Sequence, residues 1–336
     1  MKYINKTSIS TPYFSSLNEY IDNMREVVSA SAAASYVICN DQVVNEWYSG
    51  QHDFSLNSRK VDEKSRFNIA SVRKTYLGLV VSVAVYEGEI KSIDDPILDY
   101  GLPLANLDDN TDEEVTIRHL LTHTHGLTNQ GTGAFPAGTD WNYKNVGVNL
   151  LVQMIQNVYN KPLAQIVKEK IFNPYGFVET GWEQHHKEDL VWLNEQYSGD
   201  KGNDPNLFVS TRELALWGYL HLSKGNLKGK QNLPPIIFEQ STSIVSPITL
   251  KPESPRNGFF WWVKDIHRDN SEMGHELPVG SYQSLGVTGC ACLVIPQYNT
   301  VAVKMLNQTV PNPAQYDYVQ DIQTFGNMVL EGIKQI

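Results

Sequence analysis

Strand-like patterns occur at both ends of this 336-residue chain, and helical patterns fill the stretch between them. Apolar side chains recur at helical spacing over residues 16–29, and residues 35–50 indicate two short strands that turn at Asn40-Asp41. Strand-like runs return only near the carboxyl end, in residues 258–266, 287–296 and 300–308. One antiparallel sheet built from both ends of the chain accounts for this order.

The middle of the chain has helical periodicity, and each helical segment is closed by Gly, Asn or Pro. The segments are residues 71–90, 116–127, 146–160 and 163–172. The sequence therefore predicts an α+β fold: an antiparallel sheet from both termini, flanked by helices, with an inserted all-helical domain. We assign residues 1–68 and 246–336 to a discontinuous sheet domain and 69–245 to the helical domain, with a small-molecule site expected in the cleft between them.

Charge and hydropathy restrict the partners of the chain. With 27 basic and 37 acidic residues the formal net charge is −10, which argues against binding to a nucleic-acid backbone. The longest mostly apolar run, residues 76–86, is too short to span a bilayer. The amino terminus has no continuous apolar segment typical of a secretory signal, so we expect a cytoplasmic chain, or a secreted one whose leader has been removed.

Three cysteines cannot all pair within one chain, and Cys290 and Cys292 point the same way if their run is a strand. We therefore expect free thiols.

A candidate nucleophile stands at the start of a helical pattern, in Ser71-Val72-Arg73-Lys74. The spacing of i to i+3 places the Lys74 amine on the same face as the Ser71 hydroxyl, close enough to exchange a proton. The helix N-terminus adds N–H groups that stabilise an oxyanion. An N-cap serine followed by a solvated lysine is the competing interpretation. The segment 198–201 has the same spacing but lies in a Gly- and Asp-rich loop, so we treat it as a coincidental match.

Two further elements are weak by themselves. Tyr143-Lys144-Asn145 precedes an apolar helix; its tyrosine can relay a proton and its asparagine can hold a lysine or a substrate carbonyl, although plain helix capping also explains it. In residues 287–290, Gly289 allows close approach of a substrate backbone, and the Cys290 N–H is a candidate partner of the Ser71 N–H in an oxyanion hole. A core strand with a glycine is the alternative.

Taken together and in this order, the three elements resemble the serine β-lactamase, penicillin-binding protein and carboxylesterase superfamily, in the branch of class C β-lactamases and family VIII esterases. The likeness extends over roughly 66–306 and includes TIRHLLTHTHGL, FPAGTDWNYKN and LFVSTRELALWG. It implies a β-lactamase/transpeptidase-like fold, the same layout that the periodicity predicts.

The resemblance implies an acyl-enzyme mechanism without metal or cofactor. Ser71 would be the nucleophile, Lys74 and Tyr143 the acid/base pair, and Asn145, Thr288 and Gly289 would orient the substrate. Either Lys74 or Tyr143 could be the base, and the sequence does not choose between them.

One position departs from the family pattern. Val287 stands where a Lys or His commonly precedes Thr-Gly, so a cation that helps bind a substrate carboxylate is missing. We therefore expect an esterase or amidase acting on small neutral or D-amino-acid-type acyl substrates. The alternatives are a β-lactamase or DD-peptidase acting on a lactam or peptide, and a non-catalytic binding relative.

Other conspicuous residues are interpreted as structural. His119, His123 and His125 lie within seven positions but lack the accompanying pattern of a zinc site, so we expect no metal. The aromatic run 259–262 is expected to serve mainly in packing.

Overall fold

The computed structural model describes residues 5–6, 12–102, 115–128 and 133–336, and its main feature is a seven-stranded sheet. In spatial order the strands are β1 (Asn5–Lys6), β3 (Gln42–Gly50), β2 (Ala32–Cys39), β13 (Thr300–Leu306), β12 (Ala291–Ile295), β11 (Tyr282–Leu285) and β10 (Trp262–Val263). All neighbours are antiparallel except β1 and β3. The predicted sheet from both ends of the chain is thereby confirmed.

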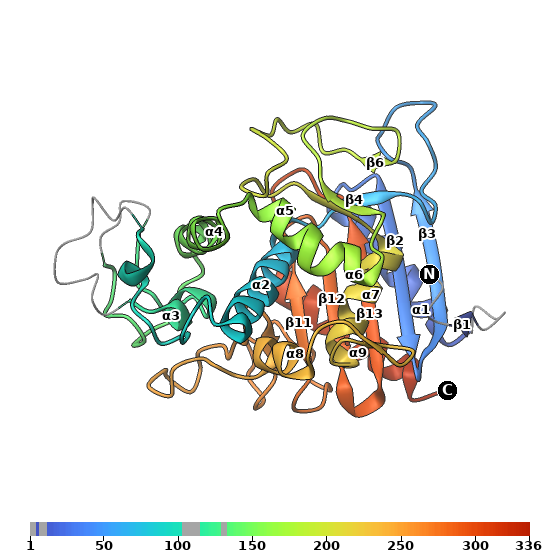
Figure 1. Cartoon of the computed structure of the whole chain (residues 1–336). Helices are drawn as coiled ribbons and strands as arrows, with labels where there is room; N and C mark the ends of the chain where they lie inside the picture. The colour runs from blue at the N-terminus through green and yellow to red at the C-terminus, as the bar shows by residue number, and fades with distance from the viewer. Residues whose placement is uncertain (1–4, 7–11, 103–114, 129–132) are drawn as a thin grey trace.

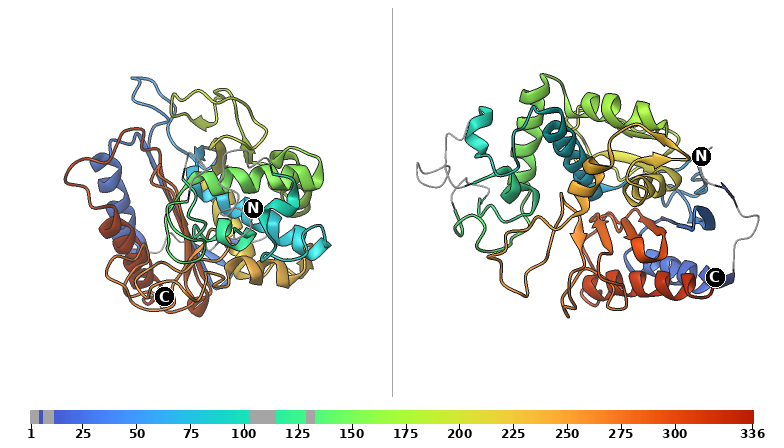
Figure 2. Two further views of the ribbon diagram at one scale, coloured as in Figure 1. Left: turned by 90° about the vertical axis from the view of Figure 1, so that its left-hand side faces the viewer. Right: turned by 60° about the horizontal axis from the view of Figure 1, so that its bottom comes forward.

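Helices cover both faces of this sheet. On one face lie α1 (Ser15–Val27) and α9 (Tyr318–Ile333), and Figure 2 shows them side by side against the strands. On the other face α7 (Thr211–Leu222) packs on β13, β12 and β2, with α2 (Lys74–Glu87) and α8 (Pro235–Thr242) beyond it. Because side chains alternate along a strand, each central strand contributes to both cores: on β13, Val303 faces α7 and Ala302 faces α9.

The rest of the middle segment extends to one side of the sheet (Figure 1). Its helices are α3 (Ile117–Leu121), α4 (Asn145–Tyr159), α5 (Leu163–Val167) and α6 (Asn173–Tyr175), the last two joined by a π-helical turn, Lys168–Phe172. A second sheet has the order β5 (Thr180–Trp182), β7 (Leu207–Ser210), β4 (Arg66–Asn68), β6 (Leu190–Val191), and β8 (Asn226–Leu227) pairs with β9 (Lys230–Gln231). Helix α7 belongs to the predicted helical domain 69–245, yet it packs on the main sheet. The two parts therefore share a core, and the predicted domain boundaries stay a prediction.

Most predicted elements occur close to their predicted bounds. The hairpin turns at Asn40-Asp41, where both residues have positive φ, as a two-residue turn of this kind requires. All three cysteines are buried and free, as expected.

Two elements are shorter than predicted, because backbone groups from distant segments take their hydrogen bonds. Helix α3 ends at Leu121, whose carbonyl accepts from the Phe260 N–H at 3.2 Å. The predicted strand 258–266 shrinks to β10, since Phe260 has positive φ and the Phe259 N–H donates to Ser241 outside the sheet. The aromatic side chains of residues 259–261 are buried, as the packing interpretation predicts.

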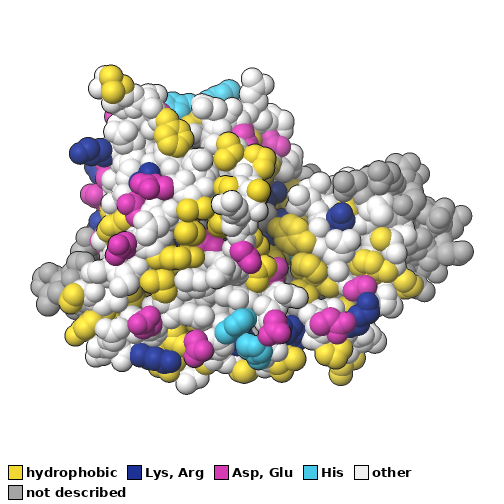
Figure 3. Space-filling view, turned by 180° about the vertical axis from the view of Figure 1, so that it is seen from behind, with side chains coloured by type: hydrophobic (Ala, Val, Ile, Leu, Met, Phe, Trp, Pro, Cys, Tyr) yellow, Lys and Arg dark blue, Asp and Glu magenta, His cyan; other side chains and the backbone are white. Residues whose placement is uncertain are grey.

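Among the helices of the described ranges, none combines the length and the apolar character that crossing a bilayer requires. On the face shown in Figure 3, Lys and Arg side chains are scattered between acidic and apolar ones rather than gathered in a basic patch.

Candidate active site

Ser71 occupies a strained turn at the start of α2. It lies in a 3-10 turn, Ala70–Arg73, that continues directly into the helix. Ala70 has φ +46°, an unfavourable value for a residue with a side chain, and the Asn68 side-chain oxygen stabilises the turn by accepting from the Ala70 N–H at 2.8 Å. The Ser71 N–H stands in the first turn, where backbone N–H groups have no acceptor within the helix. The turn therefore presents a hydroxyl and a free N–H donor together.

Lys74 is the first residue of α2 and is almost fully buried, with 2% of its surface exposed. Its amine shares a hydrogen bond with the Tyr143 phenol and lies 3.9 Å from the centre of that ring. No ion pair formed among the described residues includes Lys74. Burial, reinforced by the charge of Arg73, lowers the pKa of Lys74 to about 6, so the amine is neutral at pH 7.

Tyr143 connects the lysine to the serine. The Ser71 hydroxyl is hydrogen-bonded to the Tyr143 phenol, which also contacts the Lys74 amine. Burial raises the pKa of Tyr143, although the Ser71 hydrogen bond and the Arg73 charge oppose that shift, so the phenol stays protonated at neutral pH. His123, with ring centres 4.4 Å apart, and Trp262 at 6.0 Å hold the ring in place.

The segment 287–290 leads into β12 as predicted, but the predicted strand 287–296 begins only at Ala291, because residues 286–289 form the turn between β11 and β12. The Gly286 N–H donates to Cys290 at 2.8 Å and the Gly289 N–H donates to Gly286 at 2.9 Å. Gly289 has φ +88°, and a Cβ there would stand 2.8 Å from Leu306. This turn places Gly286 against the nucleophile, since a Cβ at Gly286 would lie 2.4 Å from the Ile69 carbonyl oxygen.

The turn also changes where two predicted site residues point. The Thr288 hydroxyl faces inward and donates to the Asn68 carbonyl at 2.9 Å. Cys290 is 1% exposed and its thiol contacts the Leu306 carbonyl. Gly289 lines the cleft, as predicted, but Thr288 and Cys290 do not.

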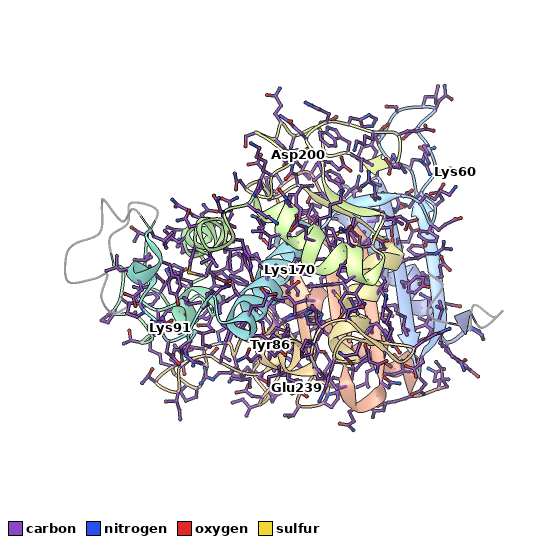
Figure 4. The ribbon with its side chains drawn as sticks, in the orientation of Figure 1. Lys60, Tyr86, Lys91, Lys170, Asp200 and Glu239 are labelled. Carbon is purple, nitrogen blue, oxygen red and sulfur yellow. The ribbon has the colours of Figure 1, made fainter. Side chains whose placement is uncertain are left out.

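The predicted site residue Asn145 and the coincidental match at 198–201 both lie at the surface. Asn145, the first residue of α4, is exposed, and its side chain makes no hydrogen bond within the described ranges. The coincidental match 198–201 lies in an outer loop near Asp200 (Figure 4), where the Ser198 hydroxyl donates to Asp204 at 2.7 Å. Only the copy at Ser71 has a helix and a cleft beside it.

The cleft beside Ser71 has a volume of about 430 Å³. Its lining comes from both halves of the chain: Ser71, Trp141, Tyr143, Trp262, Glu272, Leu285, Gly286, Val287, Gly289, Gln308, Asn312, Tyr316, Tyr318, Asp321 and Ile322. The sequence interpretation did not identify Trp141, Trp262, Glu272, Tyr316 or Tyr318 as site residues. Their spacing carries no signal of a site, because they come from four separate segments: two loops, strand β10 and the region around the start of α9.

The three clustered histidines serve the backbone and the packing. His119 completes a capping box at the start of α3, accepting from the Thr116 N–H, and His125 accepts from the Leu127 N–H at 2.9 Å. Within the described part of the chain, no group of three His, Cys, Asp or Glu side chains is arranged to hold a metal ion.

Comparisons with known proteins agree with this geometry. The β-lactamase family model matches residues 17–324. An uncharacterized protein of Alkalihalophilus pseudofirmus is 38% identical over 97% of this chain and 98% of its own length, and esterase EstB of Burkholderia gladioli is 27% identical over 37% of this chain and 40% of its own. A solved class C β-lactamase superposes with a TM-score of 0.75 over 97% of this chain and 98% of that one, at 14% identity, which shows the shared fold. The chain therefore belongs to the β-lactamase family, whose members are serine hydrolases.

Proposed function

We propose that this chain is a serine hydrolase that cleaves small esters through an acyl-enzyme on Ser71. The observation that carries the proposal is the hydrogen-bonded series from the Ser71 hydroxyl through the Tyr143 phenol to a buried amine with a pKa of about 6. A neutral amine can accept the serine proton at physiological pH, whereas an ordinary lysine could not.

This arrangement favours Lys74 over Tyr143 as the base. Ser71 Oγ attacks the acyl carbon while its proton passes through the Tyr143 phenol to the Lys74 amine, which becomes an ammonium. The ammonium returns the proton along the same path to the leaving oxygen when the ester bond breaks. A water molecule then attacks the acyl-enzyme by the same steps and releases the acid and free Ser71.

Two backbone N–H groups are the proposed oxyanion hole, and the second is that of Val287 rather than Cys290. Gly286 packs on the backbone just before Ser71, and the Val287 N–H follows it in the chain. In the described structure the Val287 N–H has no acceptor, and Val287 lines the cleft. The developing negative charge on the carbonyl oxygen would lie between this donor and the Ser71 N–H.

If Gly286 is the glycine of the family pattern, the position of the family's Lys or His falls on Ser284 rather than on Val287. A Lys or His and a Gly two residues apart share one face of a strand, and Ser284 stands in that relation to Gly286. Ser284 is 1% exposed, and its hydroxyl has no partner among the described residues. Because neither Ser284 nor Val287 carries a charge, the site favours an ester without a carboxylate over a penicillin, in keeping with the similarity to esterase EstB.

Hydrolysis of p-nitrophenyl acetate and butyrate tests the proposal. We expect turnover in the wild type, a loss of at least about 10³-fold in kcat/KM for Ser71→Ala, and a fluorophosphonate adduct on Ser71 seen as a mass increase. Ser198→Ala is the matched control, because it removes the same hydroxyl from the coincidental match, and it should retain full activity. Equal activity in Ser71→Ala and the wild type would remove Ser71 from the mechanism.

A further inference from the structure

Aromatic rings make up a large part of the cleft lining. Tyr143 stacks on Trp262 with ring centres 6.0 Å apart and lies 6.4 Å from Trp141. Tyr316, just before α9, and Tyr318, its first residue, also line the cleft. Faces of Trp and Tyr rings carry partial negative charge and attract cations.

A carboxylate without a counter-charge belongs to the same lining. Of the two acidic residues there, Asp321 is paired with Lys304 at 2.7 Å. Glu272 forms no ion pair within the described ranges, and the hydrogen bond that its carboxylate accepts comes from its own backbone N–H. It is close enough to Tyr318 for its charge to raise the pKa of that phenol, and burial raises the pKa of Glu272 itself. A carboxylate in this state gains stability from a cation placed beside it.

Basic side chains near the cleft leave Glu272 uncompensated. No Lys or Arg is among the described residues that line the cleft, and Lys74 behind Tyr143 is neutral at pH 7. The charge of Arg73 acts on Lys74 and Tyr143 but is not among the influences on the pKa of Glu272. Two arginines, Arg256 and Arg268, share an adjoining hollow with Glu272. Arg268 is bound to Asp265 through two nitrogens, and Arg256 donates to the carbonyls of residues 250, 251 and 254. Both are therefore engaged elsewhere.

We propose that the substrates of this cleft carry a cationic ammonium group, which Glu272 and the aromatic lining bind while Ser71 attacks the acyl carbon. This inference rests on the proposed hydrolase function and adds the substrate class to it. A site that recognises a carboxylate would need the opposite charge in this place. An ammonium group supplies both the positive charge that Glu272 lacks and a partner for the ring faces.

Two matched pairs of substrates test whether the cleft prefers a positively charged substrate and on which side of the ester the charge is bound. Acetylthiocholine and S-(3,3-dimethylbutyl) thioacetate differ only in a positive nitrogen replaced by carbon on the leaving-group side. The p-nitrophenyl esters of 4-(trimethylammonio)butyrate and 5,5-dimethylhexanoate differ in the same way on the acyl side. After correction for the rates without enzyme, we expect kcat/KM to favour the cation by about tenfold or more in one pair, and that pair identifies the side. A ratio of one or less in both pairs would overturn the proposal.

Variants of two glutamates show whether Glu272 is responsible. Glu272→Gln should lower the cation-to-neutral ratio about tenfold, and Glu272→Lys should invert it. Glu276→Gln is the matched control, because it removes the same charge from an exposed side chain four residues away that faces a different hollow, and the ratio should not change. An unchanged ratio in Glu272→Gln would contradict the assignment.

Binding without turnover separates this inference from the proposed function. Calorimetry with phenyltrimethylammonium at fixed ionic strength uses the Ser71→Ala protein, and Glu272→Gln in that background should weaken binding about tenfold. If no ester is cleaved and yet binding depends on Glu272, the hydrolase function fails and the cation site stands. If Ser71-dependent hydrolysis proceeds and neither ratio nor binding depends on Glu272, the cation site fails and the hydrolase stands.

Discussion

Two buried lysines in this molecule have opposite surroundings. Lys304, on β13 beneath α9, is fully buried and paired with Asp321 at 2.7 Å. Lys74, at the start of α2, is 2% exposed and contacts a phenol in place of a carboxylate. The pKa of Asp321 lies below its usual value: burial raises it, but the charge of Lys304 and hydrogen bonds from Tyr316 and Tyr20 together outweigh burial.

The difference indicates what each lysine does. An ion pair in the interior keeps both charges and joins the sheet to α9, whereas a buried amine without a partner gives up its proton. The β-lactamase fold here holds one lysine in a buried ion pair and the other beside a phenol, where we propose that it acts as a base. Five predictions test this contrast, starting with the largest effect.

Replacing Lys74 should abolish activity without unfolding the protein. Lys74→Met removes the proposed proton acceptor, and we expect kcat/KM for p-nitrophenyl butyrate to fall by about 10³-fold or more. Thermal unfolding should show equal or higher stability, because the variant no longer buries an unpaired amine. A Lys74→Met variant that stays active would show that Lys74 is not the proton acceptor.

Replacing Lys304 should have the opposite outcome. Lys304→Met leaves the Asp321 carboxylate buried and unpaired, which costs about 3–5 kcal/mol of the free energy of unfolding. Urea denaturation measures this loss, with Lys91→Met at an exposed position as the control, for which a change within about 0.5 kcal/mol is expected. The double variant Lys304→Met, Asp321→Leu should recover much of the stability, and a single variant as stable as the wild type would show that the pair contributes little.

The pH dependence of activity reports the state of Lys74 directly. With a pKa of about 6, the amine is protonated and inactive below that pH, so kcat/KM for a neutral ester should rise about tenfold per pH unit up to about pH 6 and then level off. Activity that continued to rise toward pH 10 would mean that Lys74 keeps its ordinary pKa.

The pH dependence of the free energy of unfolding tests the lowered pKa of Lys74 independently of activity. Between about pH 6 and the ordinary value of 10.5, the unfolded chain binds a proton on Lys74 that the folded chain does not, so this group makes wild-type stability increase with pH. Lys74→Met should lack that increase, and its stability advantage over the wild type should shrink as the pH rises from 6 to 10.

The smallest effect is expected at Asn145. Because its side chain is exposed and is not bonded to Lys74, Asn145→Ala should change kcat/KM for p-nitrophenyl butyrate by about threefold or less. A loss near that of Lys74→Met would mean that the asparagine turns inward to the lysine when substrate binds, and would sharpen the account of how the amine is held.

Much of the fold was predictable because it depends on local patterns. The period-two runs of β2, β3, β12 and β13 and the helical spacing of α1, α2, α4 and α9 each lie within one stretch of chain. The ends of α3 and β10 were not predictable, since the Phe260 N–H donates to the Leu121 carbonyl, about 140 residues away in the sequence. The turn at 286–289 was also missed, because an apolar run does not reveal where a glycine-rich turn begins.

Some residues of the site could also be predicted from the sequence, and others could not. Ser71, Lys74 and Tyr143 were found from two short motifs and a family resemblance, and the structure brings the three side chains into contact. Thr288 was expected to orient the substrate and the Cys290 N–H to bind the oxyanion, whereas the Thr288 hydroxyl donates to the Asn68 carbonyl and neither residue lines the cleft. Glu272, Trp262 and Tyr318 stand in no motif.

The sequence by itself determined the candidate nucleophile, the amine three residues after it and the sheet built from both ends of the chain, because these follow from short-range spacing. Only the tertiary structure decided which lysine keeps its charge and what lines the cleft. The charge on a buried amine depends on whether a carboxylate from another part of the chain reaches it, and the lining depends on which distant loops meet. Asp321 on α9 reaches Lys304, while Tyr143 reaches Lys74.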